Sequence, residues 1–447
     1  MIERAVSRVV DLTDPARSGP TNMTLEEARR LLAGADPAAV RGFAGSFALV
    51  AERGEVVRLV RSLDRPLRYF LAKREDGPLL VVAERIDRIR EHLASLGFAD
   101  QFHPSYTRMV PAHHVVELLL VGCPDPLPSY QRFFDPPRGI LAADPEEIGR
   151  RYVGALAHEI RRWILRIDPA EPIGVAFSGG VDSGAVLLVL EHVMRSLGMS
   201  PARLKAFTLA TPGGADLAQA RRFLEAVGRS FYLEEIAVPP EAIDWREAVR
   251  VVEDYKPLDV ESAAMALALC RALRERYPEW KHLADGDGGD ENLKDYPIEA
   301  NPELTIRSVL GNPMLYQEGW GVASVKHSLT YSGGQSRSCA RTYAPLARYG
   351  FEGFSPFTRP ALIEVAEAIP FAELTGGNVE RLYSLKGDIV SRGVAALTGV
   401  AFPVFPKRRF QHGVFPEGAV PEPRPESAYR REFLARYAET SGVRARP

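Results

Sequence analysis

The sequence has little that would tie the chain to a membrane, an oxidising compartment or a nucleic acid. Its three cysteines, Cys123, Cys270 and Cys339, share no metal-ligand or disulfide spacing, so we expect buried or idle thiols in a reducing compartment. No stretch reaches the roughly 20 apolar residues of a membrane span, and the N-terminus lacks the apolar core and cleavage site of a signal peptide. With 56 lysine and arginine residues against 58 aspartate and glutamate residues, there is no basic excess for nucleic acid. We therefore expect a soluble cytoplasmic protein that binds neither membrane nor nucleic acid.

The length of 447 residues exceeds what one ordinary core accommodates, so two domains are expected. Residues 43–121 alternate short runs of β-branched and aromatic residues with turn residues, which predicts a largely antiparallel unit. Thr24 and Glu27 form a capping box that predicts a helix immediately before this unit.

Prolines are dense over residues 124–138, which predicts a linker or a strap that crosses between domains. We place the domain boundary near residue 140, giving domains 1–139 and 140–447. The second domain opens with apolar residues at helical spacing and continues as alternating strands and helices, the pattern of a parallel, doubly wound α/β sheet. From about residue 297 the pattern favours helices and long loops.

A polar glycine loop, GVAFSGGVDSGAVL at residues 174–187, lies between a predicted strand and a predicted helix. Such a loop lets the backbone approach an anion, and a helix N-terminus offers unpaired N–H groups to it. Asp182 adds the hard oxygen that a phosphate-bound Mg²⁺ prefers. The chain has no G-x-x-x-x-G-K-[ST], so this is not the common loop for β- and γ-phosphates. The alternative is a capped helix start that binds nothing.

The S-G-G-x-D-S pattern resembles the pyrophosphate loop of the ATP pyrophosphatase group, whose members split ATP between the α- and β-phosphates. The group includes asparagine, β-lactam, argininosuccinate and GMP synthetases and several tRNA-modifying enzymes, and the motif alone does not choose among them. The resemblance implies nucleotide binding by Ser178, Gly179, Gly180, Asp182 and Ser183.

A second loop, LADGDGGDENL at residues 283–293, resembles the S-G-E-G-S-D-E-L loop of asparagine synthetases. The resemblance implies that Gly286 contributes to the nucleotide site and that Asp290 and Asp182 together hold Mg²⁺ on the diphosphate. A solvated acidic turn and a calcium loop are the alternatives, although the EF-hand pattern is not met.

Asp287 departs from both families that the second loop resembles, because asparagine synthetases have glutamate there and β-lactam synthetases have tyrosine. That position lies beside the attacking amine in the family. We therefore expect Asp287 to orient and deprotonate an amine, with an acyl group or nucleophile different from those of the two families.

The segment FPKRRFQHGV at residues 405–414 is similar to the segment that carries the essential lysine of asparagine and β-lactam synthetases. The resemblance implies that Lys407 stabilises negative charge on the α-phosphate and on the oxyanion of acyl transfer. By itself, P-K-R-R is more often a solvated basic turn. Residues 350–370 and 385–394 also resemble family segments, and these matches bear on the fold more than on the mechanism.

The N-terminal half resembles the family's class II glutaminase domain, of the Ntn type, from about residue 42 onward. Glutamine hydrolysis in that family needs a cysteine as first residue after processing, with its α-amine as base. This sequence has Ile2, and its first cysteine is Cys123. We therefore expect a glutaminase-like scaffold without its reaction.

The resemblance as a whole implies a ligase that forms C–N bonds, with ATP and Mg²⁺ as cofactors. A small carboxylate would be activated as an acyl-adenylate, with AMP and diphosphate as products, and transferred to ammonia or an amine, not to glutamine nitrogen. Three alternatives stay open: an intramolecular cyclase of the β-lactam synthetase type, a tRNA-modifying ATP pyrophosphatase and an inactive ATP-sensing scaffold. Also open are the two substrates, assembly as a homodimer, and the roles of the 328–343 segment and of the pair Arg409 and His412.

Overall fold

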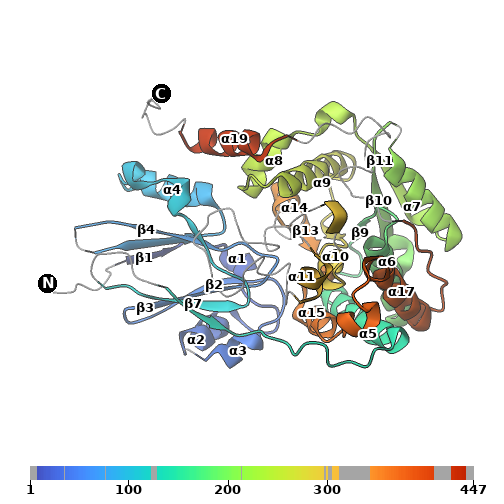
Figure 1. The fold of residues 1–447 in the computed structure, drawn as a ribbon. Coiled ribbons are helices and arrows are strands. Elements are labelled where there is room, and N and C mark those ends of the chain that lie inside the picture. The colour runs from blue at the N-terminus through green and yellow to red at the C-terminus, as the bar shows by residue number, and fades with distance from the viewer. Residues whose placement is uncertain are drawn as a thin grey trace.

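The structure is a computed structural model of the chain, with two regions joined by a short connection (Figure 1). It describes residues 8–34, 36–75, 77–121, 128–212, 214–295, 298–300, 305–311, 343–406 and 424–438.

The N-terminal region contains two four-stranded sheets. One has the order β2-β3-β7-β8 and is antiparallel, and the other has the order β1-β5-β4-β6, in which β1 is parallel to β5 and the other pairs are antiparallel. The strands are β1 (Arg8–Asp11), β2 (Ala48–Arg53), β3 (Val56–Arg61), β4 (Arg68–Ala72), β5 (Leu79–Ala83), β6 (Arg108–Met109), β7 (His114–Leu119) and β8 (Ser129–Arg132). The expected largely antiparallel unit is thus present, with β1 as an unpredicted parallel edge.

The two sheets pack face to face, and helices cover their outer faces. Apolar residues of both sheets form one shared core, while α2 and α3 cover the β2-β3-β7 side and α4 covers β4 and β5. These helices are α2 (Leu25–Ala33), α3 (Pro37–Arg41) and α4 (Ile86–Ser95). The Thr24 side chain accepts the Glu27 N–H at 3.2 Å, so α2 begins as the capping pattern predicts. A strand with apolar residues on both faces must be covered by other elements on both faces, because its apolar side chains are otherwise exposed to water.

The proline-rich stretch is not a linker throughout, because Ser129–Arg132 forms β8 and pairs with β7. Pro136 and Pro137 follow this strand, where the chain leaves the sheet. The N–H groups of Gly139 and Leu141 then donate to Glu367 and Ala368 of the second region, at 2.9 Å each. The crossing therefore spans only the last residues of the predicted linker, and a strand of polar residues at a sheet edge escaped the sequence pattern.

The second region is built on one parallel sheet of order β11-β10-β9-β12-β13. Its strands are β9 (Ile173–Ala176), β10 (Leu204–Ala210), β11 (Leu233–Ala237), β12 (His282–Ala284) and β13 (Glu352–Phe354). The chain moves outward from β9 to β11 on one side and then returns to add β12 and β13 on the other side. The order therefore reverses between β9 and β12, the place where doubly wound sheets bind ligands.

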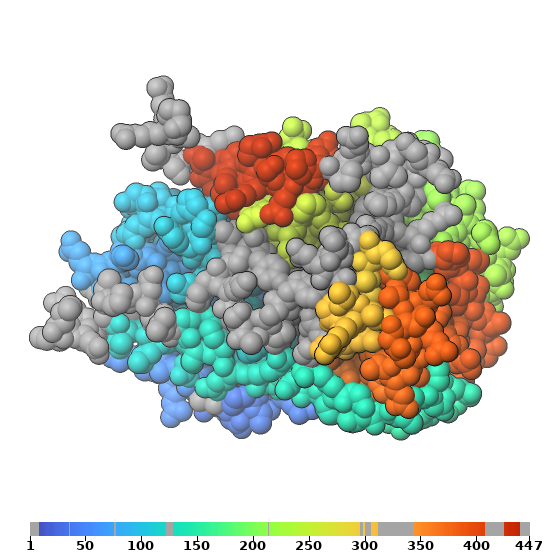
Figure 2. Space-filling view, viewed as in Figure 1, coloured from blue at the N-terminus to red at the C-terminus, as the bar shows by residue number. Residues whose placement is uncertain are grey.

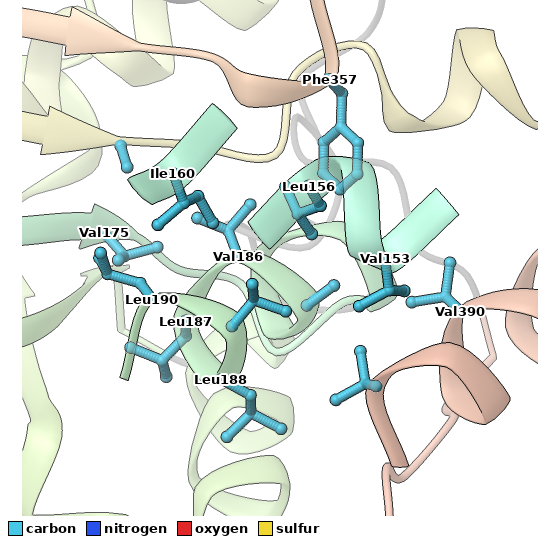
Figure 3. Packing of buried hydrophobic residues seen from close by; sticks show 14 of the residues in the cluster. Val153, Leu156, Ile160, Val175, Val186, Leu187, Leu188, Leu190, Phe357 and Val390 are labelled. Atoms are coloured by element: carbon cyan, nitrogen blue, oxygen red, sulfur yellow. The ribbon is translucent and has the colours of Figure 1, made fainter. Parts of the chain in front are cut away.

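Helices cover both faces of this sheet, as a doubly wound fold requires. One face packs on α5, α6, α7, α15 and α17, and the other packs on α9 and α14. Figure 3 shows the first core, where Val153 and Leu156 of α5 lie beside Val186 of α6 and Val390 of α17. The helices are α5 (Pro145–Ile164), α6 (Val181–Ser196), α7 (Ala215–Ala226), α8 (Trp245–Val252), α9 (Pro257–Arg276), α10 (Gly289–Asn292), α11 (Ile306–Gly311), α14 (Ala344–Arg348), α15 (Pro360–Glu367), α16 (Phe371–Thr375), α17 (Val379–Thr398) and α19 (Glu426–Ala438).

A buried glutamate of the second region holds the two regions together. Glu253 follows α8 with a left-handed φ of 54° and is 1% exposed, and its carboxylate accepts the N–H groups of Ile86 and Asp87 at 2.8 and 3.0 Å. It therefore caps the N-terminus of α4 from the other region, where a negative charge is favoured. Arg68 and Arg85 lie 3.5 and 3.4 Å from the same carboxylate.

The C-terminal helix α19 lies on the surface over α8 (Figure 2) and strengthens this contact. Arg436 pairs with Asp87 of α4 at 2.9 Å, and the Tyr437 hydroxyl donates to Glu253 at 3.3 Å. The last described helix thus contacts both regions at once.

Cys270 is a free, buried thiol, and burial raises its pKa above the ordinary cysteine value. This agrees with the idle thiol expected from the sequence, while Cys123 and Cys339 lie outside the described residues. None of the helices in the described part of the chain is both long and apolar enough to cross a membrane.

Candidate active site

Two glycine-rich loops meet at the point where the strand order reverses. The first follows β9 and the second follows β12, and the two strands pair directly, with Gly174 opposite Leu283 and Val175 opposite Ala284. Because parallel strands end at the same edge of the sheet, pairing alone brings the loops side by side. Sequence reasoning named both loops, and the sheet topology shows why they share one site.

The first loop makes a tight turn that only glycine accommodates well. Gly179 has a φ of +70°, and a Cβ there would lie 2.8 Å from the backbone of Ala220 in α7. Ser178 and Ser183 bond with each other and with the loop: their hydroxyls are 3.3 Å apart, and the Ser178 N–H donates to Ser183 Oγ at 3.3 Å. The serines therefore fix the shape of the loop in the described structure.

The helix α6 begins directly after this loop, with Gly180 as its N-cap and, among the described residues, no side-chain hydrogen bond capping it. The sequence left open whether serine and aspartate simply cap the helix. The hydroxyls instead bond within the loop, where Ser178 Oγ accepts the Gly180 N–H at 3.3 Å. The start of α6 can thus offer backbone N–H groups and a positive dipole end to an anion.

The second loop folds tightly against the first aspartate. A Cβ on Gly286 would lie 2.8 Å from Asp182 Cβ, and one on Gly289 would lie 2.2 Å from Asp182 Oδ1. Gly288 has a φ of +95°, in the left-handed region that favours glycine. These glycines let α10 approach the N-terminus of α6, so that Asp290 and Asp182 face the same cation.

That cation is Lys386, a buried lysine from the second turn of α17, which is 4% exposed. Its Nζ lies 2.5 Å from Asp182 Oδ2, contacts Asp290 Oδ1 and lies 3.6 Å from Asp295 Oδ2. Burial lowers the pKa of Lys386, but attraction to the three carboxylates outweighs burial and raises this pKa well above the usual lysine value. The ammonium is therefore charged at any physiological pH.

Lys386 is the site residue that sequence reasoning missed. The segment at 385–394 was assigned to the fold alone, because a single lysine within a helix is far more often a surface residue. A usable signal was present: Lys386 stands between Leu385 and Ile389 on the apolar side of its helix, where a charged residue needs a partner.

Hydrogen bonds of Asn292 and Tyr152 hold the second loop in place. The Asn292 amide, 2% exposed, donates to the Tyr152 hydroxyl at 3.1 Å and to the Phe357 carbonyl at 2.9 Å. Burial raises the pKa of Tyr152, so its hydroxyl stays protonated. These bonds tie α10 to α5 and to the turn before α15, which fixes where Asp290 lies.

Asp287 lies at the tip of the second loop, half-buried, with its N–H donating to Asp285 Oδ1 at 2.9 Å. It belongs to the same loop as Asp290 but is not among the carboxylates whose ion pairs with Lys386 the structure gives. Its role toward an amine stays a prediction. Lys407, Arg409, His412 and residues 328–342 lie outside the described residues.

The residues at this edge fit a magnesium ion that arrives with phosphate. Asp182 and Asp290 offer hard carboxylate oxygens, and they already gather around a positive charge. Within the described ranges, no three carboxylate, imidazole or thiol groups form a metal-binding cluster by themselves. Magnesium commonly uses one or two carboxylates and completes its shell with substrate phosphates and water, which suits this donor set.

The structure is thus an α/β protein whose parallel sheet carries a glycine loop and two neighbouring aspartates at its reversal point, the place where such sheets bind ligands. Residues 165–341 match the family model of asparagine synthase, and this range contains both loops. About two fifths of the chain is thus similar to asparagine synthases. Lys386 and Lys407 lie beyond the matched range.

No curated protein shows significant similarity to the chain. Among solved structures, an NMN synthetase from Francisella tularensis aligns with 57% of this chain and 93% of its own, at 12% identity and a TM-score of 0.23.

Proposed function

We propose that the protein is an ATP-dependent ligase that forms C–N bonds through an acyl-adenylate, releasing AMP and diphosphate. The observation that carries this proposal is the meeting of the SGG loop with the Asp182 and Asp290 carboxylates at one edge of the sheet. The first provides N–H groups for phosphate oxygens, and the second provides hard oxygens for a cation on the same phosphates. The match of residues 165–341 to the family model of asparagine synthase supports the same reaction class.

In this proposal the chain's own groups hold the leaving diphosphate while a substrate carboxylate attacks the α-phosphorus. The N–H groups at the start of α6, with Ser178 and Ser183, bind its oxygens. Asp182 and Asp290 would hold a magnesium ion that arrives with the nucleotide, and this ion would supply positive charge to the phosphate oxygens. Lys386 lies close enough to these carboxylates to contribute its ammonium to the same phosphates.

The second step transfers the acyl group from AMP to a nitrogen. We assign the orientation and deprotonation of the amine to Asp287, which extends from the same loop as Asp290. We assign Lys407 to the α-phosphate and the developing oxyanion, a role supported by the resemblance of residues 405–414 to the family segment that carries an essential lysine. The nitrogen comes from ammonia or a free amine rather than glutamine, a proposal supported by the absence of cysteine from residues 1–122.

The test is the identity of the nucleotide products. The full chain is incubated with Mg·ATP and pools of small carboxylates and amines, and the nucleotides are separated by ion-exchange chromatography. AMP with diphosphate is expected, and both should be lost in Asp182→Asn and kept in Asp388→Asn, an aspartate on the exposed side of α17 that pairs with Arg392. ADP with orthophosphate as the main products would contradict the proposal.

A further inference from the structure

Lys386 occupies the place between the aspartates that the proposed function gives to a metal ion. Asp182, Asp290 and Asp295 reach it from the start of α6, from α10 and from the residues after α10. Among the described residues, these three carboxylates surround one buried ammonium. Without a cation, Asp182 and Asp290 would repel each other across this space.

We propose that Lys386 is an exchangeable internal counter-ion, which holds Asp182 and Asp290 together in the nucleotide-free protein and moves onto the phosphates when a divalent cation enters with the nucleotide. The inference rests on the proposed function for the nature of that ligand. A lysine suits such an exchange because its ammonium is a compact point charge on a flexible four-carbon stem. The oxygens of Asp182 and Asp290 that contact the ammonium are also the hard ligands that a divalent cation prefers.

The exchange couples the binding of the metal ion to the binding of the nucleotide. A divalent ion alone must displace the Lys386 ammonium from Asp182 and Asp290 and leave it with the more distant Asp295, 3.6 Å away, among the described carboxylates, so it binds weakly. When the phosphates of a nucleotide bind as well, the Lys386 ammonium gains a new partner, and its displacement from the aspartates costs less free energy. Coupling of this kind is reciprocal, so a bound metal ion also raises the affinity for the nucleotide.

The experiment measures metal binding without turnover. Mn²⁺ binding to the full, nucleotide-free chain is followed by electron paramagnetic resonance of the free ion, for the wild type and for Lys386→Met and Lys386→Gln. Removal of the competing ammonium should tighten Mn²⁺ binding by at least about tenfold. The matched control is Lys294→Met, because Lys294 is equally buried but forms its ion pair with Glu367, 3.8 Å away.

Each result separates exchange from a purely structural lysine. Unchanged or weaker Mn²⁺ binding in both Lys386 variants would overturn the exchange, as would equal tightening in Lys294→Met. If the variants melt early, millimolar Mn²⁺ should restore their melting temperature to within a few degrees of the wild type, and failure to do so would also overturn it. If the wild type fails to bind Mn²⁺ together with α,β-methylene ATP, the proposed function fails instead.

Discussion

The two regions of the molecule each bury a large cation, and they treat it differently. In the N-terminal region Arg61 is 2% exposed and donates to the backbone carbonyls of Val110, Leu63 and Arg65, at 2.5, 3.0 and 2.9 Å. In the second region Lys386 contacts carboxylates. Carbonyls belong to the folded backbone and cannot be reassigned without unfolding it, whereas carboxylates accept any cation of suitable size.

This difference indicates which buried charge contributes to stability and which contributes to ligand binding. Arg61 fixes the turn between β3 and β4 and the residues after β6 by bonds that satisfy polar backbone groups. Lys386 joins side chains from distant parts of the chain, at the edge of the sheet where ligands bind. We therefore expect substitutions in the first region to change stability and substitutions in the second to change chemistry.

The largest effect is expected at the aspartates. Asp182→Asn and Asp290→Asn each remove a charge that would hold the metal and diphosphate, so diphosphate exchange into ATP should fall by about 1000-fold or more. The exchange is measured with radiolabelled diphosphate and a substrate carboxylate. Asp388→Asn serves as the control, and exchange within a few-fold of the wild type in either site variant would show that the loops do not hold the nucleotide.

Next in size is the effect of Arg61→Met on stability. The substitution leaves several buried carbonyls without a donor, so the free energy of unfolding should fall by about 3 kcal/mol. Urea denaturation followed by circular dichroism measures the loss. Binding of Mn²⁺ with α,β-methylene ATP, measured at urea concentrations below the unfolding transition, should be unchanged. Loss of that binding with no loss of stability would contradict the assignment of Arg61 to stability.

The third prediction distinguishes two roles within the second region, namely nucleotide binding and catalysis of amide formation. Asp287→Ala should leave diphosphate exchange within a few-fold of the wild type and slow amide formation by about 100-fold, as expected for the loss of a general base. Single-turnover measurements on preformed adenylate separate the two steps. Equal loss of both steps would place Asp287 with the metal and nucleotide groups.

The smallest effect concerns a buried carboxylate beside the contact between the regions. Asp254 accepts the N–H groups of Tyr255 and Lys256, and burial, followed by repulsion from Asp259, raises its pKa to about 7. Its unfolded pKa is about 3.9, so the folded state keeps a proton that the unfolded state releases. The stabilisation is present at low pH and is lost as the pH rises toward 7.

Asp254→Asn removes this dependence, because an amide does not ionise and its Oδ1 can still accept both N–H groups. Relative to the variant, the wild type should lose on the order of 2 kcal/mol of unfolding free energy between pH 5 and pH 8. Urea titrations across that range provide the measurement. Parallel pH profiles for the two proteins would show that Asp254 ionises normally, and Asp388→Asn should follow the wild type.

Long, strongly patterned elements were predictable, and short strands at sheet edges were not. The runs that became β2, β3 and β10 have six or seven residues and alternate apolar and polar residues or form continuous apolar segments, which is a local property of the sequence. By contrast, β1, β8 and β13 have four residues or fewer and gain their strand geometry from the neighbour with which they pair. A pattern too short to show a period carries no signal of its own.

By itself, the sequence determined the chemistry of the two loops: glycines and serines at the junction of a strand and a helix, and Asp182 and Asp290 at fixed places in those loops. Only the tertiary structure decided that Lys386 lies between them. Gly149 of α5 and Gly393 of α17 allow these helices to approach so closely that a Cβ on Gly393 would lie 2.2 Å from the Gly149 carbonyl. Such packing sets where a helix lies in space, and spacing along a chain does not report it.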